Sequence, residues 1–115
     1  MSLASLIASL SDSASLPAIE HDQFQQACLA GDCHVIDVRE QHEYEAGHIP
    51  NALNHPLSSF DPAQLPTDKP VILVCQAGAR SARALQAAIA HGRQDVAHYA
   101  HGTGGWRARG GSIAM

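Results

Sequence analysis

One segment of the chain combines residue types that suit nucleophilic chemistry. In residues 71–81 an apolar run ends at Cys75, a loop of small residues follows, and Arg80 and Ser81 open a helical pattern. The N-terminus of a helix presents unpaired backbone N–H groups and a partial positive charge, and both stabilise a thiolate or a bound anion. Only the thiolate is a good nucleophile, so we predict a reactive, partly exposed Cys75 with a lowered pKa.

The loop after Cys75 is expected to cradle an anion. Residues 77–79 are small enough for the backbone to curl around the sulfur, and Gly78 accepts a positive φ without strain. Arg80 and Arg83 are expected to add positive charge beside the loop. The alternative is an inert cysteine buried at the end of a strand, a common place for this residue. The glycine and the two arginines favour the reactive cysteine.

Strands and helices must alternate along the chain to place this loop. Residues 71–75 form the most apolar run, short and β-branched, which predicts a buried central strand in a parallel sheet. The best helical pattern covers residues 80–91, with an apolar stripe of Ala82, Leu85, Ala88 and Ile89. Further helices are expected at residues 22–30, 40–46 and 106–109, further strands at residues 35–38, 52–55 and 96–99, and a glycine-rich turn at residues 102–105. This alternation predicts an α/β fold with the loop at the carboxyl end of a strand, where such sheets bind ligands.

The length and composition fit one domain. With 115 residues, of which 45% are hydrophobic, the chain can build one core. We expect an N-terminal extension over residues 1–18, either a short helix or a loose segment, a domain over residues 19–110 and a tail over residues 111–115. The short tail is consistent with a piece of a longer protein, including one with a membrane segment further on.

The charges divide the chain into an acidic and a basic part. Up to Asp68 there are ten acidic residues and one basic residue, and after it six basic residues and one acidic residue. We expect the basic part to attract small anions, although a solvated surface of scattered charge explains the same pattern. The overall charge of −4 argues against nucleic acid as a partner.

Hydropathy and cysteine usage indicate the compartment. No stretch approaches the ~18 consecutive apolar residues of a membrane span, and the first ten residues lack the basic residues of a secretory signal. The three cysteines contain no CxxC pair and fit neither a disulfide framework nor a zinc site. These features favour a reducing compartment, so we expect a soluble, cytoplasmic protein.

Four segments, in this order and spacing, are similar to motifs of the rhodanese family. They are residues 35–40, 43–52, 75–81 and 102–106. The resemblance covers about residues 19–110. It implies a central, mostly parallel sheet flanked by helices on both faces. It also implies that Cys75 takes sulfane sulfur from a donor such as thiosulfate, holds it as a persulfide, and yields it to cyanide or a thiol.

The resemblance also assigns the loop around the sulfur. The substrate-binding loop is expected to comprise Gln76, Ala77, Gly78, Ala79, Arg80 and Ser81, with its backbone N–H groups on the persulfide and Arg80 in contact with substrate. A small anionic donor, a cyanide or thiol acceptor and possibly a protein thiol are the implied partners, and no cofactor or metal is implied. The chain departs from the family in the small Ala77 and Ala79, which leaves donor preference open, and in His101, which replaces a glycine.

Three further residues are expected to support the site. The resemblance suggests a buried Asp37 that accepts backbone hydrogen bonds and an Arg39 in an internal ion pair with Glu45 or Glu43. His48 is expected to tie a turn by hydrogen bonding, and general-acid catalysis is the alternative role for it.

The remaining histidines, cysteines and tryptophan receive structural roles. His98 and His101 have i,i+3 spacing, but no third ligand is evident, so we interpret them as surface or loop residues without a metal. Cys28 lies on the apolar face of its helix and is expected to be inert, and we assign no resolving role to Cys33. Trp106 is expected to anchor the last helix on the sheet.

Two other functions compete with sulfur transfer. Cysteine-dependent phosphatases and arsenate reductases use a similar loop, but phosphatases place five residues between cysteine and arginine, and here four separate Cys75 from Arg80. A shorter loop suits a single sulfur better than a phosphate with three equatorial oxygens. The second alternative is a catalytically silent interaction or sulfide-sensing module, which would have no chemical need of a reactive cysteine in a cradle.

Overall fold

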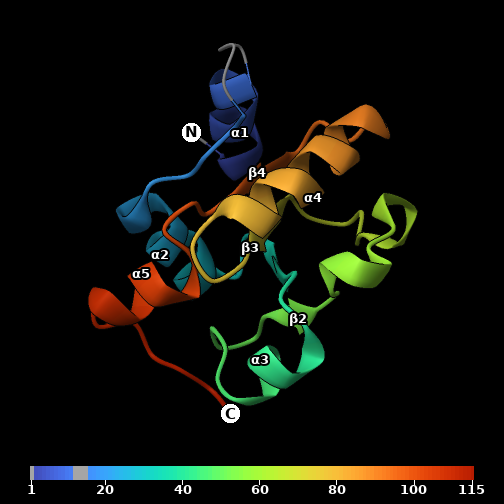
Figure 1. Cartoon of the computed structure of the whole chain (residues 1–115). Coiled ribbons are helices and arrows are strands. Elements are labelled where there is room, and N and C mark those ends of the chain that lie inside the picture. The colour runs from blue at the N-terminus through green and yellow to red at the C-terminus, as the bar shows by residue number, and fades with distance from the viewer. Residues whose placement is uncertain (1, 12–15) are drawn as a thin grey trace.

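The computed structural model describes residues 2–11 and 16–115 of the chain (Figure 1). Its strands are β1 (His34–Asp37), β2 (Leu53–Asn54), β3 (Val71–Val74) and β4 (Val96–His98). They form one sheet in the order β2-β1-β3-β4, and every pairing in it is parallel. The predicted parallel sheet is confirmed, and β3 occupies an inner position. All four strands therefore end at the same edge of the sheet, where the Cys75 loop begins.

Helices fill the connections between the strands. The α-helices are α1 (Leu3–Ser11), α2 (His21–Ala30), α3 (Gln41–Glu45), α4 (Ala79–Ala90) and α5 (Gly102–Ala108), and two 3₁₀ turns are η1 (Leu57–Ser59) and η2 (Pro62–Gln64). α4 connects the parallel neighbours β3 and β4, as expected for a crossover in an α/β fold.

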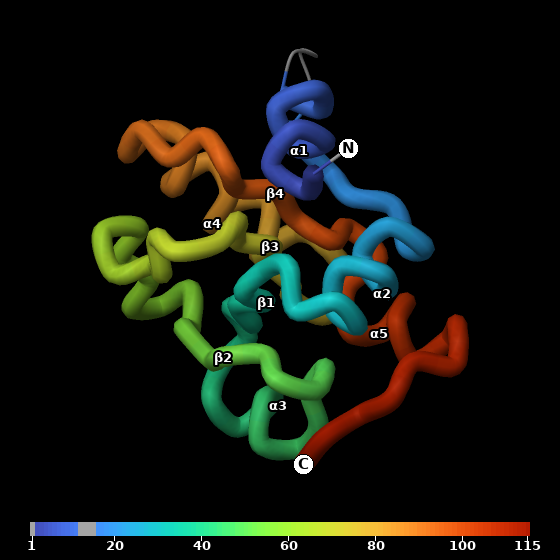
Figure 2. Tube along the Cα trace, turned by 180° about the vertical axis from the view of Figure 1, so that it is seen from behind, coloured from blue at the N-terminus to red at the C-terminus, as the bar shows by residue number. Residues whose placement is uncertain are grey.

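Both faces of the sheet are covered, as predicted (Figures 1 and 2). On one face Ile72 and Val74 pack with Ile7 of α1, Phe24 of α2 and Trp106 of α5. On the other face Val71, Leu73 and Cys75 pack with Ala84, Leu85 and Ala88 of α4. Successive side chains of a strand point to opposite faces, so β3 contributes to both clusters. Its four residues are fully buried, which explains their uniformly apolar character.

Two helices differ from the sequence-based expectation. In α4 the buried face contains Ser81 and Ala84, while Ile89, assigned to the apolar stripe, is 42% exposed. The polar Ser81 is therefore on the buried face of α4, in the first turn that follows the Cys75 loop. The expected turn at residues 102–105 is the first part of α5. It is helical because the N–H groups of Thr103 and Gly104 donate to the carbonyls of Cys75 and Gln76.

The ends of the chain pack on the domain. In α1 the side chain of Ile7 is completely buried, so this part of the extension is neither loose nor detached. The other part of the expected helix, residues 1 and 12–15, lies outside the described residues. Near the C-terminus Ala114 pairs with His48 through two backbone hydrogen bonds of 2.8 and 2.9 Å, which brings the last residues beside α3 (Figure 2). No helix in the described part of the chain is long and apolar enough to span a bilayer.

Candidate active site

The Cys75 sulfur lies in a turn of backbone between β3 and α4. The N–H of Gly78 donates to Cys75 Sγ at 3.0 Å, and Ser81 Oγ lies 3.6 Å from the same sulfur. Gly78 caps α4, so the sulfur sits at the positive end of a 12-residue helix. The predicted combination of strand end, loop and helix N-terminus is therefore present at Cys75.

The loop can take this path only because position 78 is glycine. Gly78 has φ 105°, a conformation that residues with a side chain rarely adopt. A Cβ at this position would also lie 2.6 Å from the backbone oxygen of Ala100. The loop therefore packs against Ala100, in the segment that follows β4. In this position the N–H of Gly78 points to the sulfur.

The surroundings of the sulfur favour its ionised form. Burial raises the pKa of Cys75, but hydrogen bonds from the Ser81 hydroxyl and from the backbone N–H groups of Ser81, Gly78 and Ala77 outweigh it. The pKa of Cys75 therefore lies below its ordinary value, in the predicted direction. The hydrogen bonds that lower this pKa come from uncharged groups. The pKa of Arg80 is raised mainly by Glu43 and also by Cys75, so this guanidinium adds an electrostatic attraction to the thiolate.

Cys75 is less accessible than the sequence suggested. The residue is 1% exposed, whereas a partly exposed cysteine was expected. Its side chain turns toward the apolar cluster under α4, while Gln76, Ala77 and Ala79 of the loop are exposed. The prediction of a partly exposed sulfur is wrong for this structure.

Arg80 does not extend freely toward a substrate. Its guanidinium binds both carboxylate oxygens of Glu43 on α3, at 2.6 and 3.0 Å. These hydrogen bonds hold the pKa of Glu43 at about 2. Sequence reasoning considered Glu43 as a partner of Arg39 and missed this pair, and the expected free positive charge of Arg80 is correspondingly neutralised.

Asp37 and Arg39 form a buried ion pair at the end of β1. Asp37 Oδ2 accepts from Arg39 Nη2 at 2.8 Å, and Asp37 Oδ1 accepts from the backbone N–H of Arg39 at 3.0 Å. Arg39 also donates to the carbonyl of Gly47 at 2.7 Å. The expected pairing of Arg39 with Glu45 or Glu43 is wrong, because the aspartate two residues earlier already satisfies the guanidinium.

His48 lies shortly after α3, where its backbone pairs with that of Ala114. Its Nδ1 is 2.9 Å from the carbonyl oxygen of Tyr44, and the two rings stack with their centroids 3.8 Å apart. Tyr44 in turn donates from its hydroxyl to the carbonyl of Ala52. These contacts join α3 to the segment before β2 and agree with a structural role for His48.

His98 was expected on the surface, but it is buried. The residue is 6% exposed, and its Nδ1 lies 2.8 Å from Ser81 Oγ, the hydroxyl that neighbours Cys75 Sγ. A signal was available in the sequence, because His98 follows Val96 by two positions in an apolar strand and so shares its face. The interpretation of His98 as a surface or loop residue is wrong.

The family of the chain follows from comparison with known proteins. The rhodanese-like domain matches residues 20–109, which is most of the chain. This chain belongs to the rhodanese-like domain family. The result confirms the resemblance derived from the four motifs, and members and relatives of this family include sulfurtransferases.

Three similar proteins illustrate the range of rhodanese-like domains. The uncharacterized protein YqhL of Bacillus subtilis is 42% identical over 81 residues, covering 69% of this chain and 62% of YqhL. The human single-domain sulfurtransferase TSTD1 is 25% identical, with a TM-score of 0.72 over 83% of this chain and 98% of TSTD1. RPA3614 of Rhodopseudomonas palustris, described as a possible tyrosine phosphatase, is 26% identical, with a TM-score of 0.77 over 99% of this chain and 95% of its own. The chain thus spans less than two thirds of the length of YqhL.

Cys28 and Cys33 contact each other on the opposite side of the rhodanese-like domain. Cys28 lies in the last turn of α2 and Cys33 precedes β1, so both lie near the edge where strands begin, away from Cys75. The Cys28 thiol donates to the Cys33 sulfur, which lowers the pKa of Cys33 and raises that of Cys28. This contact was not predicted, because four residues that include a turn separate the two cysteines.

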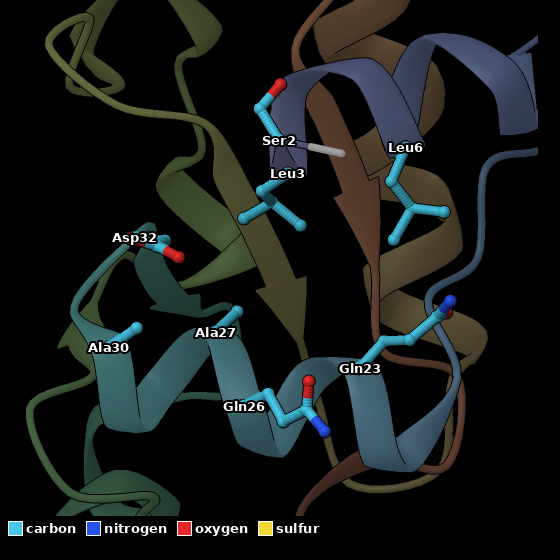
Figure 3. A pocket seen from close by; sticks show the side chains of 8 residues that line it. All are labelled: Ser2, Leu3, Leu6, Gln23, Gln26, Ala27, Ala30 and Asp32. Atoms are coloured by element: carbon cyan, nitrogen blue, oxygen red, sulfur yellow. The ribbon is translucent and has the colours of Figure 1, made fainter.

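A hollow between α1 and α2 also lies apart from the sulfur loop (Figure 3). It has a volume of about 360 Å³, and Leu3 and Leu6 of α1 face Gln23 and Ala27 of α2 across it. None of its described lining residues belongs to the Cys75 loop.

Proposed function

We propose that this rhodanese-like domain is a sulfurtransferase that carries a sulfane sulfur on Cys75. The observation that supports it most is the Gly78 N–H at 3.0 Å from Cys75 Sγ, at the N-terminus of α4. A thiolate held by backbone donors is a nucleophile, and the same donors can stabilise the negative charge of a persulfide anion. The sulfurtransferase TSTD1, which shares the fold over most of both chains, adds support.

The transfer proceeds in two balanced steps. With thiosulfate as the donor, the Cys75 thiolate attacks the sulfane sulfur, a new S–S bond forms, and sulfite leaves with the electrons of the old S–S bond. Cyanide or an acceptor thiolate then attacks the outer sulfur of the persulfide, and the electrons of that S–S bond return to Cys75. The cycle consumes no oxidant or reductant and requires no cofactor. A small anionic donor suits the positive end of α4.

Intact-protein mass spectrometry tests the proposal. Incubation with thiosulfate should add the mass of one sulfur, ~32 Da, and cyanide should remove it with release of thiocyanate. Cys75→Ser should abolish the addition. The matched control is Cys28→Ser/Cys33→Ser, which removes the other two thiols and should retain it. An unchanged mass under excess thiosulfate and glutathione persulfide contradicts the proposal and favours an interaction module.

A phosphatase is the second candidate, because RPA3614 is described as a possible tyrosine phosphatase and shares the fold. Two observations in this chain disfavour it. Only four residues lie between Cys75 and Arg80, and the Arg80 guanidinium is bound to Glu43 instead of facing the loop. Hydrolysis of an aryl phosphate that depends on Cys75, without sulfur addition, would favour the phosphatase over the sulfurtransferase.

A further inference from the structure

A buried polar chain leads from the Cys75 sulfur to a histidine of β4. Ser81 Oγ lies 3.6 Å from Cys75 Sγ and 2.8 Å from His98 Nδ1. Ser81 is fully buried and His98 is 6% exposed. The three side chains therefore share an environment in which each polar atom needs a hydrogen-bond partner.

The position of His98 is tightly determined by the backbone. Its N–H donates to the carbonyl of Pro17 and its carbonyl accepts from Ile19, both at 3.0 Å. In the sheet it lies opposite Leu73, whose side chain packs under α4. His98 shares that face and so points toward the first turn of α4, where Ser81 lies. Leu73 belongs to the apolar cluster under α4, and a buried imidazole on this face is costly unless it makes a specific hydrogen bond.

The Ser81 hydroxyl has one proton and several acceptors. The Gly78 carbonyl lies 3.2 Å away, His98 Nδ1 2.8 Å, and the sulfur 3.6 Å. If Nδ1 carries no proton, the nearest acceptor for the hydroxyl is the histidine. If Nδ1 carries a proton, the Ser81 oxygen accepts a hydrogen bond from His98, and the Ser81 O–H can donate to the Gly78 carbonyl or to the sulfur. A charge-assisted bond to a thiolate is stronger than one to a neutral carbonyl.

We propose that His98 is a positioning residue for Cys75: its Nδ1–H donates to Ser81 Oγ, so that the Ser81 hydroxyl donates to the thiolate. Burial lowers the pKa of His98, so the ring is neutral near pH 7 and carries one N–H. The negative charge on the sulfur favours the tautomer with a proton on Nδ1. In that tautomer the N–H of His98 and the O–H of Ser81 both point toward the charge. The proposal adds a positioning residue to the proposed sulfur-transfer site. It rests on the proposed function only for the identity of the reacting sulfur.

Other charged groups near Cys75 do not replace this donor. Arg80 attracts the thiolate electrostatically, but its N–H groups donate to Glu43, and Asp37 is paired with Arg39. The backbone donors of residues 77, 78 and 81 belong to the loop and the first turn of α4. Among the described residues, the Ser81 hydroxyl is thus the donor to the sulfur that His98 contacts.

The test is a titration of Cys75 in a Cys28→Ser/Cys33→Ser background, where one thiol remains. The rate of iodoacetamide alkylation is measured against pH. Ser81→Ala should raise the midpoint by about one pH unit, the size expected for one hydrogen bond to a charged group. His98→Leu should raise it by less, because the Ser81 hydroxyl is then divided between the thiolate and the Gly78 carbonyl. His98→Asn should restore most of the shift, because its amide nitrogen can donate from near the position of Nδ1.

The double variant His98→Leu/Ser81→Ala shows whether His98 acts through Ser81. Its midpoint should equal that of Ser81→Ala alone. Additive shifts, or an unchanged midpoint in His98→Leu, would overturn the proposal. The ¹⁵N chemical shifts of the His98 ring in the unmodified chain provide a measurement without any substitution: a protonated Nδ1 supports the proposal, and a bare Nδ1 contradicts it.

The outcomes separate this proposal from the proposed function. Sulfur addition by thiosulfate together with a wild-type midpoint in His98→Leu means that the positioning role fails and the sulfurtransferase stands. The expected midpoints without any sulfur addition mean that the relay from His98 to Cys75 is real and the sulfurtransferase fails.

Discussion

Arg80 and Glu43, 37 residues apart in the chain, form a two-point ion pair that fastens the Cys75 loop to α3. The two N–O distances are 2.6 and 3.0 Å, and both side chains are partly exposed. Arg80 stands in the first turn of α4, so the pair joins the helix that follows the nucleophile to the opposite rim of the site.

Glu43→Gln should weaken this pair in a pH-dependent way. The native pKa of Glu43 is about 2, below the unfolded value of about 4.3. The stabilisation by the carboxylate is therefore complete above pH ~5 and is lost as the pH falls toward 2. Partial exposure limits the effect to about 0.5–1 kcal/mol at pH 7. Chemical denaturation of both proteins at pH 7 and pH 2.5 should show a difference that becomes much smaller in acid, and an equal difference at both pH values would contradict the pair.

The Cys75 thiol should ionise at a lower pH in the native protein than in the unfolded one. The Ser81 hydroxyl and the loop amides stabilise the thiolate, so alkylation should reach its plateau at lower pH than in the same protein in urea. The measurement uses Cys28→Ser/Cys33→Ser to isolate one thiol. A native midpoint at or above the unfolded one would remove the electrostatic basis of the proposed function.

Gly78→Ala should distort the loop, and Gly92→Ala is its matched control. The two glycines have φ values of 105° and 102°, so both alanines are strained by about 1–2 kcal/mol. Only the Cβ at position 78 meets an obstacle, the Ala100 oxygen at 2.6 Å, whereas no atom lies within 4 Å at position 92. Gly78→Ala should therefore lose about 2–4 kcal/mol in denaturant unfolding and also sulfur transfer. Equal losses in both variants would show that the contact with Ala100 is unimportant.

Arg39→Met should leave the buried carboxylate of Asp37 without its partner. Removal of one member of a buried pair costs about 3–5 kcal/mol, which equilibrium unfolding would detect. The double variant Asp37→Leu/Arg39→Met removes both charges and should recover part of the loss. A double variant less stable than Arg39→Met would mean that the Asp37 carboxylate matters mainly through its backbone hydrogen bond.

Thr103→Val should be neutral or stabilising, by up to about 1 kcal/mol. Thr103 is fully buried, and its hydroxyl has no hydrogen-bond partner in the described part of the chain. Valine has nearly the same shape without the polar atom. Thr103→Ser keeps the hydroxyl and loses a methyl group, so it should be destabilising. A clear loss of stability in Thr103→Val, measured by thermal unfolding, would reveal a partner for the hydroxyl.

The sequence by itself determined the alternation of strands and helices and pointed to Cys75 as the candidate nucleophile. The apolar run before Cys75 fits only a strand covered on both faces, and the stripe of small residues after it fits a helix on that sheet. Both signals are local, because burial and periodicity act on neighbouring residues. The short loop between the strand and the helix places Cys75 at the N-terminus of that helix, independently of the rest of the chain.

Only the tertiary structure decided the partners of the charged and polar side chains. Arg80 meets Glu43 and not a substrate, Arg39 turns back to Asp37, and His98 lies beneath Ser81. Each of these contacts depends on how segments far apart in the chain meet in space, or on which of several neighbouring carboxylates comes within reach. The spacing of residues along a sequence does not show which distant segments meet or which carboxylate comes within reach. An ion pair or hydrogen bond depends on ångström-scale distances between side chains.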